Sequence, residues 1–194
     1  MLIVVRHGRT AANAAGELLG RRDPRLDDIG RDQAAAIATA VPNGARLISS
    51  PLRRCTETAA AISAEVEIDE RLIELDYGDL EGTPVSDVSA STWSAWRADD
   101  DWRPDNGESH NDLAQRVWSL LDDLASQAAE HDIVLVSHVS PIKAAAAWAL
   151  GAPIGISWHC FVEQASILRI GTGRHGASLR SFNETSHLKR QNRN

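Results

Sequence analysis

The sequence predicts an α/β fold, a three-layer α/β/α sandwich around a mostly parallel central sheet. Two runs, residues 2–5 and 133–136, are wholly apolar and show no alternation, which is typical of parallel strands covered by helices on both faces. Segments with helical periodicity separate these runs from other strand-like segments, so strands and helices alternate along the chain. With 194 residues and 43% hydrophobic content, the chain can form one well-packed domain.

Each predicted element rests on a local apolar pattern and on the turn residues that bound it. Asp27 or Asp28 can cap an amphipathic helix that ends at Pro42-Asn43-Gly44, and Ser50-Pro51 can open the next helix. Helices are expected at residues 28–41, 51–62, 111–130 and 141–150. Strands are expected at residues 2–5, 45–49, 66–69 and 133–136, with two or three more around 160–163, 166–170 and 179–182.

The domain is expected to span residues 1–183, followed by a polar tail at 184–194. A change of composition marks an insertion at about residues 83–108, with three tryptophans near the acidic run 99–101. We interpret this insertion as a short helical lid. Its tryptophans (Trp93, Trp96 and Trp102) are more simply interpreted as packing residues than as a substrate platform.

Composition excludes several classes of partner. The formal net charge of −7 argues against nucleic acid or an anionic membrane as the main partner, because both favour a basic surface. No stretch approaches the roughly 20 apolar residues of a membrane span, and a charged residue comes too early for a signal peptide. Cys55 and Cys160 have no metal-ligand spacing. We therefore expect a cytoplasmic protein with reduced thiols, for which a homodimer is left open.

Both apolar strands end in a histidine, and this pattern predicts a site. Arg6, His7 and Gly8 follow the first strand, and His138 follows the second. If the strands are parallel neighbours, the two imidazoles meet at the carboxyl edge of the sheet, where open α/β folds bind ligands. Arg53, in the first turn of a helix, is expected at the same edge, and Gly8 would let a ligand approach the main chain. Two guanidinium groups and two imidazoles would bind an oxygen-rich anion such as phosphate, with one imidazole as nucleophile.

Five segments, in order, resemble the motifs of the histidine phosphatase superfamily, also called phosphoglycerate mutase-like. They are Arg6-His7-Gly8 with Thr10 and Asn13, Ser49-Ser50-Pro51 with the residues up to Ala59, the loop 72–82, Gly107-Glu108-Ser109, and Val136-Ser137-His138. Together they cover residues 2 to about 150. The resemblance implies a phosphomonoesterase that needs no metal and no cofactor and acts on a small phosphorylated metabolite.

The resemblance also implies a role for individual residues. His7 would be the nucleophile that becomes a phosphohistidine, and Glu74 would protonate the leaving oxygen and then accept a proton from water. The phosphate would be bound by Arg6, Arg53, His138, Asn13, Gly8 and the backbone N–H of Val139. Glu81 and Glu108 are interpreted as loop anchors, although either could replace Glu74 as the acid.

Two positions depart from the common family pattern, and the activity has alternatives. Val139 stands where glycine is usual, and Leu19 stands where a polar residue is frequent. A cofactor-dependent phosphoglycerate mutase-type phosphomutase is the main alternative to a phosphatase, and a phosphate-binding module without activity is the third. We predict hydrolysis, because the segment 83–106 is short and has Arg97 and Arg103 as its only cations. The physiological ester is not predicted.

Overall fold

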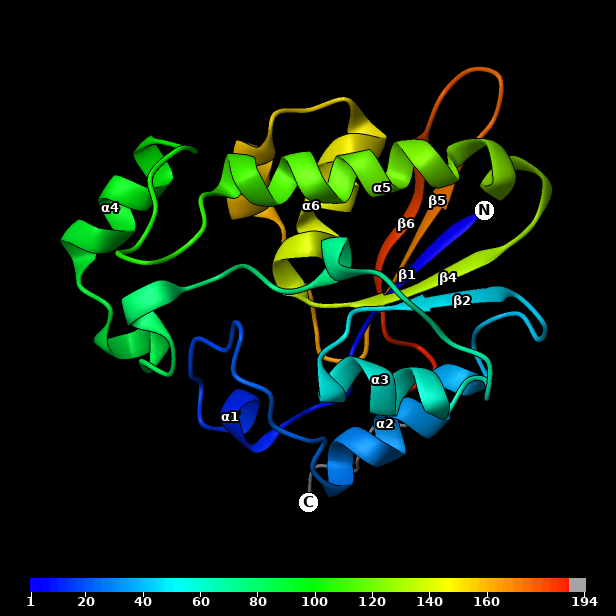
Figure 1. Ribbon diagram of the computed structural model, residues 1–194, viewed down its shortest axis with the longest axis horizontal. Coiled ribbons are helices and arrows are strands. Elements are labelled where there is room, and N and C mark those ends of the chain that lie inside the picture. The colour runs from blue at the N-terminus through cyan, green and yellow to red at the C-terminus, as the bar shows by residue number, and fades with distance from the viewer. Residues whose placement is uncertain (189–194) are drawn as a thin grey trace.

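The computed structural model describes residues 1–188. They form one central sheet with helices packed around it (Figure 1). Within this part of the chain the sheet has six strands in the order β3-β2-β4-β1-β5-β6. Their bounds are β1 Leu2–Arg6, β2 Arg46–Ser49, β3 Glu67–Ile68, β4 Ile133–Ser137, β5 Ile167–Gly171 and β6 Ser178–Glu184. The first four strands pair in parallel, whereas β5 and β6 pair antiparallel. The predicted mostly parallel sheet is confirmed.

Helices cover both faces of this sheet, as expected for a three-layer fold. The α-helices are α1 Ala11–Ala14, α2 Asp28–Ala38, α3 Arg53–Ala60, α4 Ala90–Ala98, α5 His110–Glu130 and α6 Val139–Leu150. Short 3-10 helices lie at η1 Glu70–Leu72, η2 Gly78–Leu80, η3 Val85–Asp87 and η4 Ile154–His159. Figure 1 shows α5 and α6 on one side of the sheet and α2 and α3 on the other, with α4 standing apart. None of the helices in residues 1–188 is long and apolar enough to cross a membrane.

The continuous apolar run of β1 is explained by burial on both faces. Leu2 and Val4 belong to the core under α5 and α6, whereas Ile3 and Val5 belong to the core under α2 and α3. All four side chains are at most 2% exposed, and each such burial stabilises the fold by about 1.5–3 kcal/mol. The parallel pairing of β1 with β4 sets Arg6 opposite Ser137, so the residues that follow both strands emerge side by side.

Three local expectations need correction. Residues 160–163 form no strand, and the carbonyl of Val162 accepts a hydrogen bond from the Arg6 side chain at 2.8 Å. The predicted loop after β1 contains the short helix α1, closed by a capping box. Glu184 ends β6, and Leu188 packs against the core, so the tail predicted from residue 184 is in part attached to the domain. Residues 189–194 lie outside the described part.

The predicted lid contains α4, and its tryptophans pack together as expected. Trp96 is 1% exposed and stacks on Trp93, with ring centroids 5.6 Å apart. The ring centroid of Trp102 lies 5.2 Å from that of Trp96. Trp158 of η4 meets Trp96 edge-on, with ring centroids 5.9 Å apart. The lid is therefore attached by an aromatic cluster to the segment that follows α6.

Candidate active site

His7 lies at the carboxyl end of β1, where the strand pairing brings it to His138. The two ring centroids are 5.1 Å apart, and the rings meet edge-on. Nδ1 of His7 lies 2.7 Å from the carbonyl oxygen of Gly8, which can only accept, so Nδ1 carries the proton and Nε2 keeps a lone pair. Burial, then Arg54 and Arg6, lower the pKa of His7 well below its usual value. His7 is thus uncharged at neutral pH, as a nucleophile requires.

His138 is fully buried and makes two well-defined hydrogen bonds. Arg54 donates from Nε to Nδ1 of His138 at 3.1 Å, so the remaining proton is on Nε2, which lies 2.8 Å from Oγ of Ser50. Burial, with Arg54 as the next cause, lowers the pKa of His138 well below its usual value. His138 is therefore uncharged at neutral pH. The positive charge comes from guanidinium groups, and His138 contributes an N–H.

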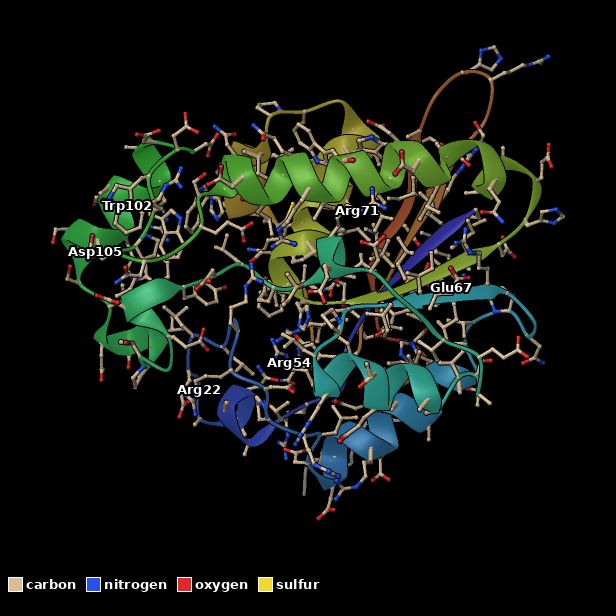
Figure 2. All side chains as sticks on the ribbon, viewed as in Figure 1. Arg22, Arg54, Glu67, Arg71, Trp102 and Asp105 are labelled. Carbon is tan, nitrogen blue, oxygen red and sulfur yellow. The ribbon has the colours of Figure 1, made fainter. Side chains whose placement is uncertain are left out.

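Arg54, and not Arg53, is the arginine of α3 that reaches the histidines. Arg54 is fully buried and donates to the carbonyl oxygens of Gly20 and Arg22, both at 2.7 Å. Figure 2 shows Arg54 beside the first turn of α3. The side chain of Arg53 is 59% exposed and lies 3.5 Å from Asp23. The predicted position of Arg53 is thus wrong, because α3 begins at that residue and turns it toward solvent.

The sequence held a signal for Arg54 that our prediction missed. The buried face of α3 consists of residues 54, 55, 58 and 59, which repeat at the three-to-four-residue spacing of a helix. Thr58 is one turn after Arg54, so the apolar periodicity of the helix favours residue 54 over its neighbour. A strict count from the buried positions would have placed Arg54 at the sheet edge.

Arg6 supplies the second guanidinium group. Its Nη1 donates to the carbonyl oxygen of Val162, and its Nε is buried without a partner among residues 1–188. Burial lowers the pKa of Arg6, and the largest opposing effect comes from the nearby carboxyl group of Glu74. Arg6 therefore keeps an unused donor beside the histidines.

Glu74 is 3% exposed and lies between these groups and α6. Its carboxylate accepts from the backbone N–H of Leu75 at 2.7 Å and from that of Ser140 at 3.2 Å. Ser140 is in the first turn of α6, whose aligned peptide dipoles favour a nearby carboxylate. The structure thus brings Arg6, His7, Glu74 and His138 together as predicted, and it adds Arg54.

The chain is also similar to known proteins. The family model described as histidine phosphatase superfamily (branch 1) matches residues 2–185. The chain belongs to this superfamily.

Among curated relatives, a glucosyl-3-phosphoglycerate phosphatase of Mycolicibacterium vanbaalenii is 37% identical to this chain over 169 residues, an alignment that covers 79% of this chain and 75% of the relative. A solved mycobacterial glucosyl-3-phosphoglycerate phosphatase in complex with VO3 has a TM-score of 0.85 at 30% identity, covering 95% of this chain and 98% of the other. A phosphoserine phosphatase from Entamoeba histolytica, solved with 3-phosphoglyceric acid, has a TM-score of 0.88 at 30% identity, covering 96% and 98%.

Gly8 is needed for packing, and its predicted role in binding phosphate stays a prediction. A Cβ atom at Gly8 would lie 2.3 Å from the carbonyl oxygen of Gly30 in α2. The N–H of Gly8 donates to Oγ1 of Thr58 at 3.1 Å. The main chain at Gly8 is thus approached by the protein itself.

Asn13 and Val139 are the remaining residues that were predicted to bind phosphate. Oδ1 of Asn13 accepts from the N–H and the hydroxyl of Thr10, which fixes the amide and leaves its NH₂ group as the donor. Val139 is the first residue of α6 and follows His138 directly. Their roles in binding phosphate remain predictions.

Two acidic residues that we interpreted as anchors hold the loops of the site. Glu81 accepts from the backbone N–H groups of Gly20 and Arg21, the loop whose carbonyl groups bind Arg54. Glu108 pairs with Arg116 at 2.7 Å. Arg116 in turn donates to the carbonyl groups of the loop that ends at Glu74.

Residues 1–188 contain no group of three or more His, Cys, Asp or Glu side chains placed to hold a metal ion.

Proposed function

We propose that the protein is a phosphomonoesterase that hydrolyses a small-molecule phosphate ester through a phosphohistidine at His7, without a metal ion. One observation carries this proposal: a neutral, buried imidazole has its proton held on Nδ1, so that Nε2 is the nucleophilic atom. The guanidinium groups of Arg6 and Arg54 are near enough to His7 to lower the pKa of its imidazole. The same charges would bind a phosphate dianion.

The reaction would proceed in two displacements at phosphorus. Nε2 of His7 forms a bond to phosphorus while the bond to the ester oxygen breaks, and Glu74, entering protonated, gives its proton to that oxygen. Glu74 then takes a proton from water, whose oxygen displaces the imidazole and releases inorganic phosphate. Arg6 and Arg54 would stabilise the charge on the transferring group, and His138 would join them once its Nε2–H is released from Ser50.

The lid supports hydrolysis over the mutase alternative. A mutase must retain a bisphosphate and exclude water, which favours spare cations above the site. Both cations of the segment 83–106 have partners: Arg97 lies over the rings of Trp93 and Trp158, and Arg103 pairs with Asp112 at 3.1 Å. Neither is left to bind a second phosphate.

The test is to denature the enzyme during turnover of p-nitrophenyl phosphate and to map the bound phosphoryl group. We expect an acid-labile, base-stable adduct on His7, formed equally after treatment with EDTA. His7→Ala should lose at least about 10³-fold in kcat, whereas His131→Ala, at the exposed end of α5, should stay within about 2-fold. An adduct on serine or aspartate, or activity that returns only with added metal, would refute the mechanism.

A second assay separates hydrolysis from the mutase reaction. The enzyme is supplied with 3-phosphoglycerate, with and without 2,3-bisphosphoglycerate, and both free phosphate and 2-phosphoglycerate are measured. We expect phosphate release as the dominant product in both cases. Rapid formation of 2-phosphoglycerate without matching phosphate would show a mutase instead.

A further inference from the structure

The loop that carries Glu74 is held by side chains from two other elements. Residues 73–77 lie between η1 and η2 and belong to no helix or strand. Buried carbonyl groups of such irregular backbone need donors from elsewhere, and here four successive carbonyl groups, those of residues 71–74, each accept from a side chain. Arg116 of α5 donates to those of Arg71, Ile73 and Glu74, at 2.8, 2.7 and 3.2 Å, and Oγ of Ser137 donates to that of Leu72 at 2.6 Å.

Arg116 uses every N–H group of its guanidinium in this arrangement. Nε and one N–H of Nη2 donate to the two carboxylate oxygens of Glu108, at 2.7 and 2.9 Å. The other three N–H groups, two on Nη1 and one on Nη2, reach the loop carbonyls. A guanidinium has five N–H donors, so none is left for a ligand. The bidentate pair with Glu108 fixes the plane of the guanidinium, and with it the positions of the three donors that hold the loop.

The position of the Glu74 carboxylate depends on this backbone. Within residues 1–188 its hydrogen-bond donors are backbone N–H groups, that of Leu75 in the same loop and that of Ser140 in the first turn of α6. A shift of the loop would therefore move the carboxyl group relative to α6 and to His7. An acid must lie within about 2.6–3.2 Å of the oxygen that it protonates, so a displacement of about 1 Å is costly.

We propose that Arg116, fixed by Glu108, is a positioning residue for Glu74: it holds the loop so that the carboxyl group meets the leaving oxygen of the ester. The inference rests on the proposed function, in which Glu74 is the proton donor. Because all five N–H groups of Arg116 are used within the protein, its effect on the reaction passes through Glu74. Loss of Arg116 should therefore matter where the leaving oxygen needs a proton and matter little where it does not.

The test compares phenyl phosphate with p-nitrophenyl phosphate, which have nearly the same shape. Phenolate is the stronger base and needs the proton more. The ratio kcat/KM reports the steps up to release of the phenol, so slow dephosphorylation does not affect it. Arg116→Met should lose about 10–100-fold in kcat/KM on phenyl phosphate and less than about 3-fold on p-nitrophenyl phosphate. Equal losses on the two esters would overturn the inference, because a general structural defect affects both alike.

Arg169 of β5 offers a matched control. It also combines an ion pair, with Glu184, and a bond to a backbone carbonyl, that of Ala40, and its side chain is 24% exposed against 18% for Arg116. Arg169→Met should change kcat/KM by less than about 2-fold on both esters. A selective loss on phenyl phosphate in this variant would show that the effect is not specific to Arg116, and would overturn the inference.

Two milder variants separate geometry from charge and from folding. Arg116 is near enough to His138 to help lower the pKa of that imidazole, so its charge could also act there. Arg116→Lys keeps the charge but has three donors on one nitrogen, which cannot reach the carboxylate and three carbonyls. It should lose nearly as much as Arg116→Met, and full activity would overturn the inference. Glu108→Gln preserves the packing if Arg116→Met fails to fold, and it should lose about 3–10-fold on phenyl phosphate alone.

A double-mutant cycle decides whether Arg116 acts through Glu74. In a Glu74→Gln background, Arg116→Met should cost less than a further 2-fold or so on phenyl phosphate, since the acid is already absent. Losses that multiply would overturn the inference. The single variant Glu74→Gln separates the two proposals: if it affects both esters equally, Glu74 is not the proton donor and the proposed mechanism fails together with the inference. If Glu74→Gln discriminates between the esters and Arg116→Met does not, the inference alone fails.

Discussion

Replacing Arg54 and Arg53 in turn is a sharp test of the site, because the two arginines are adjacent in sequence and opposite in environment. Arg54→Met removes three donors, two from buried acceptors (Nδ1 of His138 and the carbonyl group of Gly20) and one from the part-buried carbonyl group of Arg22. Each buried acceptor left unpaired costs about 1–3 kcal/mol, which relief from burying the charge offsets in part. We therefore expect Arg54→Met to lower the free energy of unfolding by about 2–4 kcal/mol.

The effect on catalysis should be larger than the effect on stability. A preorganised donor to the charge of a transition state contributes roughly 10²–10³-fold in kcat, and Arg54 also sets the tautomer of His138. Arg54→Met should lose at least that factor, and Arg54→Lys should lose about 10–100-fold, because a point charge cannot donate to three separated acceptors. Arg53→Met removes an exposed pair with Asp23, so it should cost less than about 1 kcal/mol and less than about 2-fold in kcat.

The assay measures kcat and KM on p-nitrophenyl phosphate at temperatures where urea titration shows each variant to be folded. Measuring the unfolding of each variant alongside its kinetics distinguishes a loss of catalytic activity from a loss of folded protein. Arg54→Lys provides a variant that retains the charge. Comparable losses for Arg53→Met and Arg54→Met, or full activity of Arg54→Lys, would refute the assignment of Arg54.

Two other predictions concern Glu74 and His110. Glu74→Gln should reduce the hydrolysis of an alkyl phosphate at least about 10-fold more than that of p-nitrophenyl phosphate, since only the alkoxide needs a proton to leave; equal losses would point to slow dephosphorylation or to another acid. Burial lowers the pKa of His110 to about 4, so between pH 6.5 and 4 the unfolded chain binds a proton that the folded chain does not, and stability must fall as the pH falls. Urea titrations at pH 7 and 4.5 should show that the free energy of unfolding falls by about 2–3 kcal/mol less for His110→Phe than for the wild type. An equal fall in both proteins would contradict the lowered pKa of His110.

Local patterns in the sequence were sufficient for the fold and for part of the site. The apolar runs at residues 2–5 and 133–136 predict buried parallel strands, because a strand covered on both faces has no polar face to alternate. Parallel neighbours end at one edge, so His7 and His138 must meet if the two strands are adjacent, and the structure confirms that adjacency. The sequence also favoured packing over a substrate platform for the lid tryptophans, which pack against one another.

Other features depended on the tertiary structure. A helix rotates by about 100° per residue, so the start of α3 at residue 53 turns Arg53 to solvent and Arg54 to the histidines. The uncharged state of both imidazoles depends on burial beside two guanidinium groups that come from different elements. The side chains that hold the carbonyl groups of residues 71–74 come from α5 and β4, more than 40 residues further along the chain. Sequence patterns report which face of one element is buried, whereas charge states and such contacts are set by distances between elements, which only the packed chain determines.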